Sequence, residues 1–119
     1  AEGPSPDSVS YTGSGNSSEE IMVYIYAINY LGEVNLNGSE FYPIKGEKDM
    51  NYNYTGPATL NRGSNLFEVS YEALPDAWMN KIEIKAYQYN WETGEETVIA
   101  NWVIEGQAGR RQFEIVLDN

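Results

Sequence analysis

The sequence contains neither cysteine nor histidine. The absence of cysteine excludes disulfide bonds and thiol nucleophiles, and the absence of histidine excludes Ser–His catalytic triads. Nearly all zinc and haem sites depend on these two residue types and are excluded with them. An enzyme built on this chain would have to use carboxylates, a serine–lysine pair, tyrosine or a bound metal ion.

Positive charge and long apolar runs are also scarce. The chain has 7 Lys and Arg against 18 Asp and Glu, which gives a net charge of −11. This excess of negative charge opposes binding to a phosphate backbone or an anionic lipid surface, so we expect no nucleic-acid partner. No segment approaches the ~20 consecutive apolar residues that cross a bilayer as a helix, so we expect no direct membrane insertion.

The acidic residues lack the spacing of calcium sites. They are 14 Glu and 4 Asp, without an Asp-x-Asp run or an EF-hand pattern. The best local candidate is a run of alternate polar residues, Glu47, Asp49, Asn51 and Asn53. A solvated polar loop explains this run more simply. The sequence therefore predicts no metal site and no cofactor.

Carboxylate pairs are the remaining route to catalysis. Glu68, Glu72, Glu83 and Glu114 offer pairs for a small carboxylate-dependent hydrolase, which also requires one raised pKa and a cleft. Among 18 acidic residues, such pairs arise on strand surfaces without a function. No Ser-x-x-Lys motif supports a serine nucleophile. We expect no catalytic residues and a protein that is not an enzyme, and we keep the hydrolase as a third hypothesis.

Residues 1–19 differ in composition from the rest of the chain. They are rich in Ser, Gly and Pro, and Val9 and Tyr11 are their only large apolar residues. Such a segment buries too little surface to offset its conformational entropy, which predicts a flexible leader at 1–19 and a single β-sandwich domain at 20–119. In composition the leader resembles the spacers of bacterial surface proteins. With the absence of cysteine, this favours an extracytoplasmic location, secreted or on the cell surface, with a signal or anchor not present in this chain.

Segments of alternating apolar and polar residues fill the remaining chain. Strands are expected at 21–31, 34–37, 41–45, 66–73, 82–90, 97–105 and 112–117, with a short one near 52–55. No segment has sustained helical periodicity, and only Pro75–Trp78 suits a single helical turn. The pattern predicts an all-β fold, an antiparallel two-sheet β-sandwich of about seven or eight strands, immunoglobulin-like or transthyretin-like.

Particular residues predict turns, edges and core. Asn37-Gly38 between two apolar segments predicts a tight hairpin, and Pro43 predicts a strand at a sheet edge. Trp78 is expected to close one end of the sandwich. Alternation in the last two strands predicts a buried face made of Val98, Ala100, Trp102, Ile104, Phe113, Ile115 and Leu117.

Aromatic residues are the most informative feature of a sequence with 10 Tyr. In the strand expected at 82–90, the apolar residues of 82–86 mark the buried face. Side chains alternate along a strand, so Tyr87, Tyr89 and Trp91 are expected on the opposite face as an exposed strip. A β-bulge at this point of the strand would reverse the facing and bury them.

A second set of rings lies in the strand expected at 21–31, where Tyr24, Tyr26 and Tyr30 share one face. If the two strands belong to one sheet, its outer face holds a row of rings. Such rings stack against sugars and are enriched in protein interfaces, although cross-strand aromatic pairs also stabilise sheets without binding anything. The candidate ligand-binding residues are Tyr87, Tyr89, Trp91, Tyr24 and Tyr26.

Two function hypotheses of different classes follow. The leading one is a noncatalytic, extracytoplasmic β-sandwich module that binds a glycan or protein ligand through its surface aromatic residues. The alternative is a purely structural or assembly domain of a larger surface protein. The alternative predicts covered rings or sheet edges that are open for strand exchange.

Overall fold

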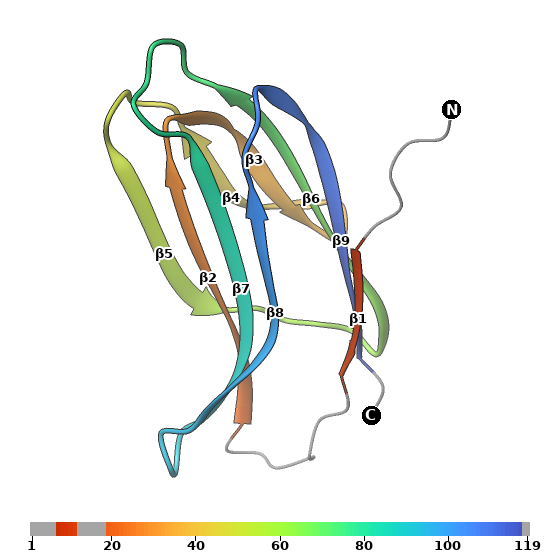
Figure 1. Ribbon diagram of the computed structural model, residues 1–119. Helices are drawn as coiled ribbons and strands as arrows, with labels where there is room; N and C mark the ends of the chain where they lie inside the picture. The colour runs from red at the N-terminus through yellow and green to blue at the C-terminus, as the bar shows by residue number, and fades with distance from the viewer. Residues whose placement is uncertain (1–6, 12–18, 118–119) are drawn as a thin grey trace.

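The computed structural model describes residues 7–11 and 19–117. Within these two ranges the chain forms nine strands in two sheets and no helix (Figure 1). In chain order, the strands are β1 (Asp7–Tyr11), β2 (Glu19–Ile28), β3 (Tyr30–Leu36), β4 (Ser39–Lys45), β5 (Asn51–Pro57), β6 (Gly63–Ala73), β7 (Lys81–Asn90), β8 (Glu96–Ile104) and β9 (Ala108–Leu117). The prediction of an all-β, two-sheet architecture is confirmed. No helix among the described residues is long and apolar enough to cross a membrane.

The two sheets lie face to face and enclose one hydrophobic core (Figure 1). One sheet has the strand order β1-β9-β6-β3-β4, and the other has the order β5-β2-β7-β8. Neighbouring strands are antiparallel except β1 and β9, which are parallel. The expectation of a wholly antiparallel fold is therefore wrong at β1, and the five-stranded sheet is mixed.

Strand β1 lies inside the segment expected to be a flexible leader. It pairs with residues 113–117 of β9, and Val9 packs against the hydrophobic core. Ser8 also donates a hydrogen bond to the Glu114 carboxylate on β9, at 2.8 Å. The leader expectation does not hold for residues 7–11, because long-range pairing supplies the stabilisation that their composition lacks. The rest of the leader, up to the start of β2, lies outside the described residues.

The single strand expected at 21–31 is divided by a corner at Asn29. This residue has a φ of 60°, so β2 ends before it and β3 begins after it in the other sheet. The side chain is buried, donates to the Met79 carbonyl at 2.6 Å and accepts from the Asp49 N–H at 2.6 Å. Asparagine is one of the few residues besides glycine that readily adopt this left-handed conformation.

The hairpin between β3 and β4 forms at the predicted turn. Asn37 and Gly38 have φ angles of 51° and 85°, the pair of positive values that a two-residue type I′ hairpin requires. The Asn37 side chain also accepts a hydrogen bond from the Leu66 N–H on β6, at 2.8 Å. β4 is an edge strand of its sheet, so the position predicted from Pro43 is confirmed.

The core contains large side chains from both sheets. Most of the predicted core residues are buried: Ala100, Trp102, Ile104, Phe113 and Ile115. Trp102 stacks on Phe113 with ring centroids 4.5 Å apart and an interplanar angle of 18°. This contact joins β8 of one sheet to β9 of the other. Leu117, at the end of β9, is only half-buried.

Val98 is 56% exposed, and its prediction as a core residue is wrong. Ala86 pairs with Ala100, whereas Tyr87 pairs with Val98, so Ile99 is the extra residue of a β-bulge in β8. A bulge places two residues of one strand opposite one residue of its partner and interrupts the alternation. Simple alternation places Val98 on the same buried face as Ala100, but the bulge between them turns Val98 to the outer face.

The connection between β6 and β7 forms a turn and not the predicted helical turn at 75–78. Asp76 has a φ of 57°, which a right-handed helical turn does not allow. Trp78 is 73% exposed. It therefore does not close the end of the sandwich.

Candidate functional site

The outer face of the four-stranded sheet holds the tyrosines singled out in the sequence. Alternate residues of β2 and β7 are buried in the core, so Tyr24, Tyr26, Tyr87 and Tyr89 project from the opposite face. β2 and β7 pair without a register shift, which keeps this facing along both strands and sets Tyr24 beside Lys85. These four tyrosines therefore share one face of one sheet.

Tyr24 and Lys85 lie near the centre of this outer face. The Tyr24 hydroxyl donates to the Asn53 side chain on β5, at 3.1 Å. The Lys85 ammonium lies 5.9 Å from the ring centroid of Tyr24 and 5.2 Å from that of Tyr87, within the range of cation–π attraction. Burial, together with the nearby carboxylate of Glu83, raises the pKa of Tyr24. The lysine thus occupies ring surface that a ligand would otherwise contact.

Tyr87 is 8% exposed, so the expected strip of three exposed rings is wrong at this residue. The bulge at this point has its extra residue in β8, so β7 keeps its facing. Tyr87 is buried on the outer face itself, between its cross-strand neighbours Met22 and Val98 and with the Lys85 ammonium over its ring. Burial, followed by the charge of Glu96, raises its pKa.

Tyr89 and Trp91 form an open aromatic corner at the β7–β8 turn, called the Trp91 corner below. Their ring centroids are 4.7 Å apart and their planes meet at 77°. Trp91 is 60% exposed, and Tyr89 is half-buried. The Asn90 side chain between them accepts hydrogen bonds from the backbone N–H groups of Glu92 and Thr93, at 2.9 and 3.1 Å. A hydrogen-bonded turn therefore presents the indole.

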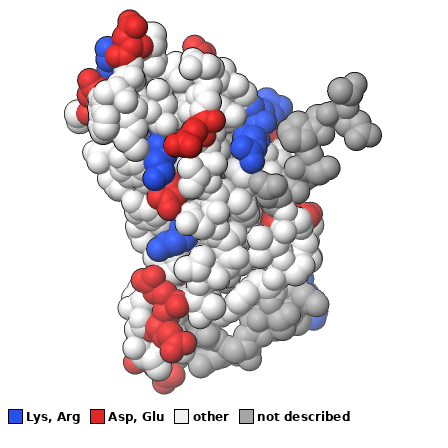
Figure 2. Space-filling model, in the orientation of Figure 1, with Lys and Arg blue, Asp and Glu red and all other residues white. Residues whose placement is uncertain are grey.

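Carboxylates surround the Trp91 corner. Glu20 on β2 and Glu96 on β8 are the cross-strand neighbours of Tyr89, one on each side. Glu92 and Glu95 lie in the turn that follows, and all four carboxylate side chains are exposed. Figure 2 shows acidic side chains gathered at the β7–β8 turn, below a stretch of the same face where the two signs of charge alternate.

Tyr30 does not belong to the outer face, and the expectation that it shares a face with the other tyrosines of its segment is wrong. The corner at Asn29 carries it into the other sheet and the core, where it is 1% exposed. Its hydroxyl donates to the Gly106 carbonyl at 2.7 Å and accepts from the Gly106 N–H at 2.9 Å. Its ring meets Tyr71 edge-on. Its role is structural.

The carboxylates considered for catalysis are divided between the two sheets. Glu83 lies on the outer face of the four-stranded sheet, whereas Glu68, Glu72 and Glu114 lie on the outer face of the five-stranded sheet. Two serine hydroxyls donate to Glu114 and lower its pKa. A general acid requires the opposite shift.

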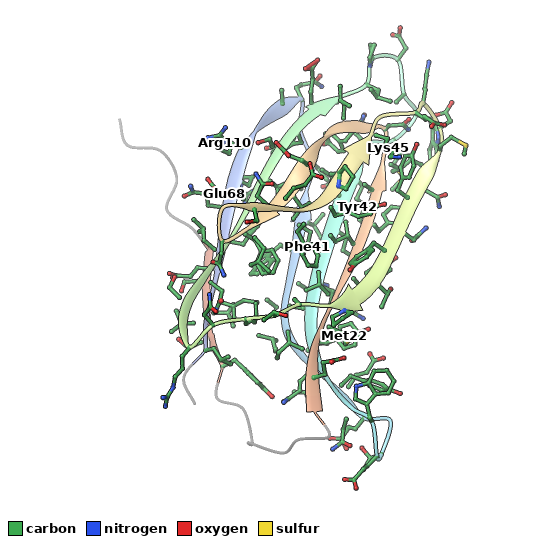
Figure 3. The ribbon with its side chains drawn as sticks, turned by 180° about the vertical axis from the view of Figure 1, so that it is seen from behind. Met22, Phe41, Tyr42, Lys45, Glu68 and Arg110 are labelled. Carbon is green, nitrogen blue, oxygen red and sulfur yellow. The ribbon has the colours of Figure 1, made fainter. Side chains whose placement is uncertain are left out.

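Sequence reasoning missed an aromatic cluster at the edge strands β4 and β5. Phe41 and Tyr42 are consecutive in β4 (Figure 3), yet their ring centroids lie 5.6 and 5.2 Å from that of Tyr54 on β5. Val34 pairs with Tyr42 while the next residue of β3 pairs with Glu40, so Phe41 is the extra residue of a bulge. The bulge lets both rings turn toward Tyr54 and pack against the core. Only the strand pairing reveals this cluster.

The polar loop considered for calcium is bound to the fold by Asp49, whose N–H donates to the Asn29 side chain. Within the described ranges, no group of three or more carboxylates is placed to hold a metal ion.

Comparisons with protein-family models, with curated proteins and with solved structures find no match for this chain. A proposal about its function therefore rests on its own side chains and their geometry.

Proposed function

We propose that this chain is a noncatalytic, extracytoplasmic binding module that holds a glycan or protein ligand on the outer face of its four-stranded sheet. The carrying observation is the Trp91 corner, where an indole that is 60% exposed stands beside Tyr89. Tyr24 and Tyr26 extend the same face along β2. Clustered Tyr and Trp side chains of this kind are enriched among the residues that dominate binding energy.

We further propose that the sandwich is immunoglobulin-like or transthyretin-like. Successive strands change sheet after β1, β2, β4, β5, β6 and β8, and stay within one sheet only at the β3–β4 and β7–β8 hairpins. Repeated crossing between two packed sheets is typical of Greek-key sandwiches. This architecture leaves the outer faces of both sheets available for ligands.

A structural or assembly domain is the second candidate, and strand β8 favours it. β8 is an edge strand of its sheet, and its outward residues Val98 and Val103 are 56% and 45% exposed. Exposed edge strands accept a strand from another chain. The bulge at Ile99 opposes such pairing, because edge strands commonly use bulges to prevent it. For this reason we place the assembly role second.

The test is a ligand screen with the full chain on a glycan array and on immobilised extracellular proteins. The double variant Tyr89→Ala, Trp91→Ala should weaken binding of the retained ligand by about tenfold or more, because it removes both rings of the corner. The matched control is Trp78→Ala, which removes an even more exposed indole from the β6–β7 connection. The control should bind as the wild type does.

Two results would contradict the binding proposal. A wild-type chain that retains neither a glycan nor a protein would favour the assembly role. A double variant that folds and binds normally would remove the Trp91 corner from the site. Thermal unfolding must be recorded for each variant, since an aromatic pair contributes about 0.5–1.5 kcal/mol beyond its buried area.

A further inference from the structure

The shape of the Trp91 corner indicates which chemical group it receives. The ring planes of Tyr89 and Trp91 meet at 77°, so the two rings do not form one flat stacking surface. A sugar chain stacks best on a flat ring surface. A compact cation is attracted to the electron-rich face of an aromatic ring and gains from contact with two of them. The corner therefore suits a cationic group better than a flat one.

The charged residues that the structure places at the corner are glutamates. Glu20 and Glu96 stand on either side of Tyr89, and Glu92 and Glu95 occupy the turn. In a chain with a net charge of −11, these exposed carboxylates create a local potential that attracts cations and accelerates their approach.

The outer face already contains the same chemistry within the chain. The Lys85 ammonium lies 5.2 Å from the Tyr87 ring centroid and 5.9 Å from that of Tyr24. One lysine is therefore already held over tyrosine rings on this sheet. Tyr89 is the next aromatic residue after Tyr87 along β7. Trp91 follows the end of this strand, and its indole is exposed.

Starting from the proposed function, we infer that the ligand is a protein segment bearing lysine or arginine, and that one of these side chains enters the Trp91 corner. The aliphatic stem packs on the exposed indole, as long cationic side chains do on apolar surfaces. The cationic head group then lies against the ring of Tyr89 and the carboxylates of Glu20 and Glu96.

The probe is a short synthetic peptide of alternating lysine and glycine, titrated into the full chain by isothermal calorimetry. We expect saturable binding that weakens several-fold between about 20 and about 200 mM NaCl, because exposed charges are screened by salt. Trp91→Ala, which leaves every charge in place, should weaken binding by about tenfold, in line with the upper range of cation–π contacts. Glu20→Gln with Glu96→Gln should weaken it about threefold or more.

Two control proteins separate the corner from a general attraction of polycations. Trp78→Ala removes the other exposed indole, and Glu40→Gln with Glu47→Gln removes the same number of charges from the exposed surface at β4. Both should bind the peptide as the wild type does. A peptide of alternating glutamate and glycine should not bind at all.

Each remaining outcome overturns the inference. If Trp91→Ala binds the lysine peptide normally, or if the two charge variants weaken it equally, the attraction is nonspecific. If a neutral glycan binds through Trp91 while the lysine peptide does not, the proposed binding function stands and the cationic ligand is wrong. If nothing binds in any screen, the binding function itself fails.

Discussion

Asn29 and Asp49, 20 positions apart in the chain, hold two loops of the sandwich together. The Asn29 Oδ1 accepts from the Asp49 N–H at 2.6 Å, and its Nδ2 lies 3.4 Å from the Asp49 Oδ1. Both residues have a φ of 60°. Asn29 turns the chain from β2 to β3, and Asp49 lies in the connection from β4 to β5. Since Nδ2 also donates to the Met79 carbonyl, one buried side chain joins three connections between the sheets.

Asn29→Ala should lower the free energy of unfolding by about 3 kcal/mol, because it leaves part-buried backbone groups of Asp49 and Met79 without this partner and places alanine at a left-handed φ. Urea denaturation measures this loss. Asn29→Gly removes the same hydrogen bonds, but glycine tolerates the left-handed φ. The loss of stability in Asn29→Gly should therefore be about 1 kcal/mol smaller than in Asn29→Ala. Equal stability of Asn29→Ala and the wild type would show that the corner does not depend on this side chain.

Trp102→Ala should cost about 3–5 kcal/mol, since it opens a cavity where the indole stacks on Phe113. That is a large part of the total stability of a domain of this size. Val98→Ala, on the outer side of the same strand, should change stability by about 0.5 kcal/mol or less. Chemical denaturation of both variants tests the bulge as well. A larger loss for Val98→Ala than for Trp102→Ala would contradict the facing of β8.

The stability of the domain should depend on pH through the carboxyl group of Glu114, which lies on β9 beside the edge strand β1. The hydroxyls of Ser64 and Ser8 donate to its carboxylate and lower its pKa below the ordinary value. A carboxyl group whose pKa is lower in the folded state stabilises the fold above its unfolded pKa, and this contribution disappears as pH falls through the lower, folded value. The stability difference between the wild type and Glu114→Gln should therefore be present at neutral pH and absent in strong acid. A difference that persists unchanged in acid would contradict the hydrogen-bonded carboxylate.

Removing residues 1–11 should lower the melting temperature by about 5 °C, because β1 pairs with β9 and Val9 covers part of the core. Calorimetry of the shortened chain measures the shift. Removing residues 1–6 alone leaves β1 intact and serves as the control. An unchanged melting temperature after removal of residues 1–11 would mean that β1 adds nothing to the stability of the domain.

Local alternation predicted most strands of this fold, and long-range contacts explain what it missed. The segment 21–31 is apolar on both sides of Asn29, so no local signal separates β2 from β3. The corner depends on Asp49 and Met79, which are distant in sequence. Likewise β1 exists through pairing with β9 at the other end of the chain. Val9 and Tyr11 alternate with serines as in a strand, but a segment of 5 residues rich in serine is too weak a signal on its own.

In the candidate site, too, local alternation predicts part of the arrangement and long-range contacts decide the rest. The shared face of Tyr24 and Tyr89 follows from alternation in two strands. Whether a ring on that face is exposed depends on its neighbours in the adjacent strands, which is why the burial of Tyr87 between Met22 and Val98 was not predicted. The Trp91 corner combines side chains from three strands and a turn. Three of its glutamates follow Trp91 closely in the sequence, whereas Glu20 joins them only through the register of β2 with β7.

The parallel pairing of β1 with β9 determines how the sandwich responds to tension. A pull on the chain before β1 and after β9 draws these two strands in opposite directions along their common axis (Figure 1). The hydrogen bonds of their ladder, which runs from Asp7 to Tyr11, are then loaded together in shear. In an antiparallel pair of terminal strands, the same pull would open the bonds one after another. A strand of 5 residues thus gives the first and last parts of this domain a mechanical clamp.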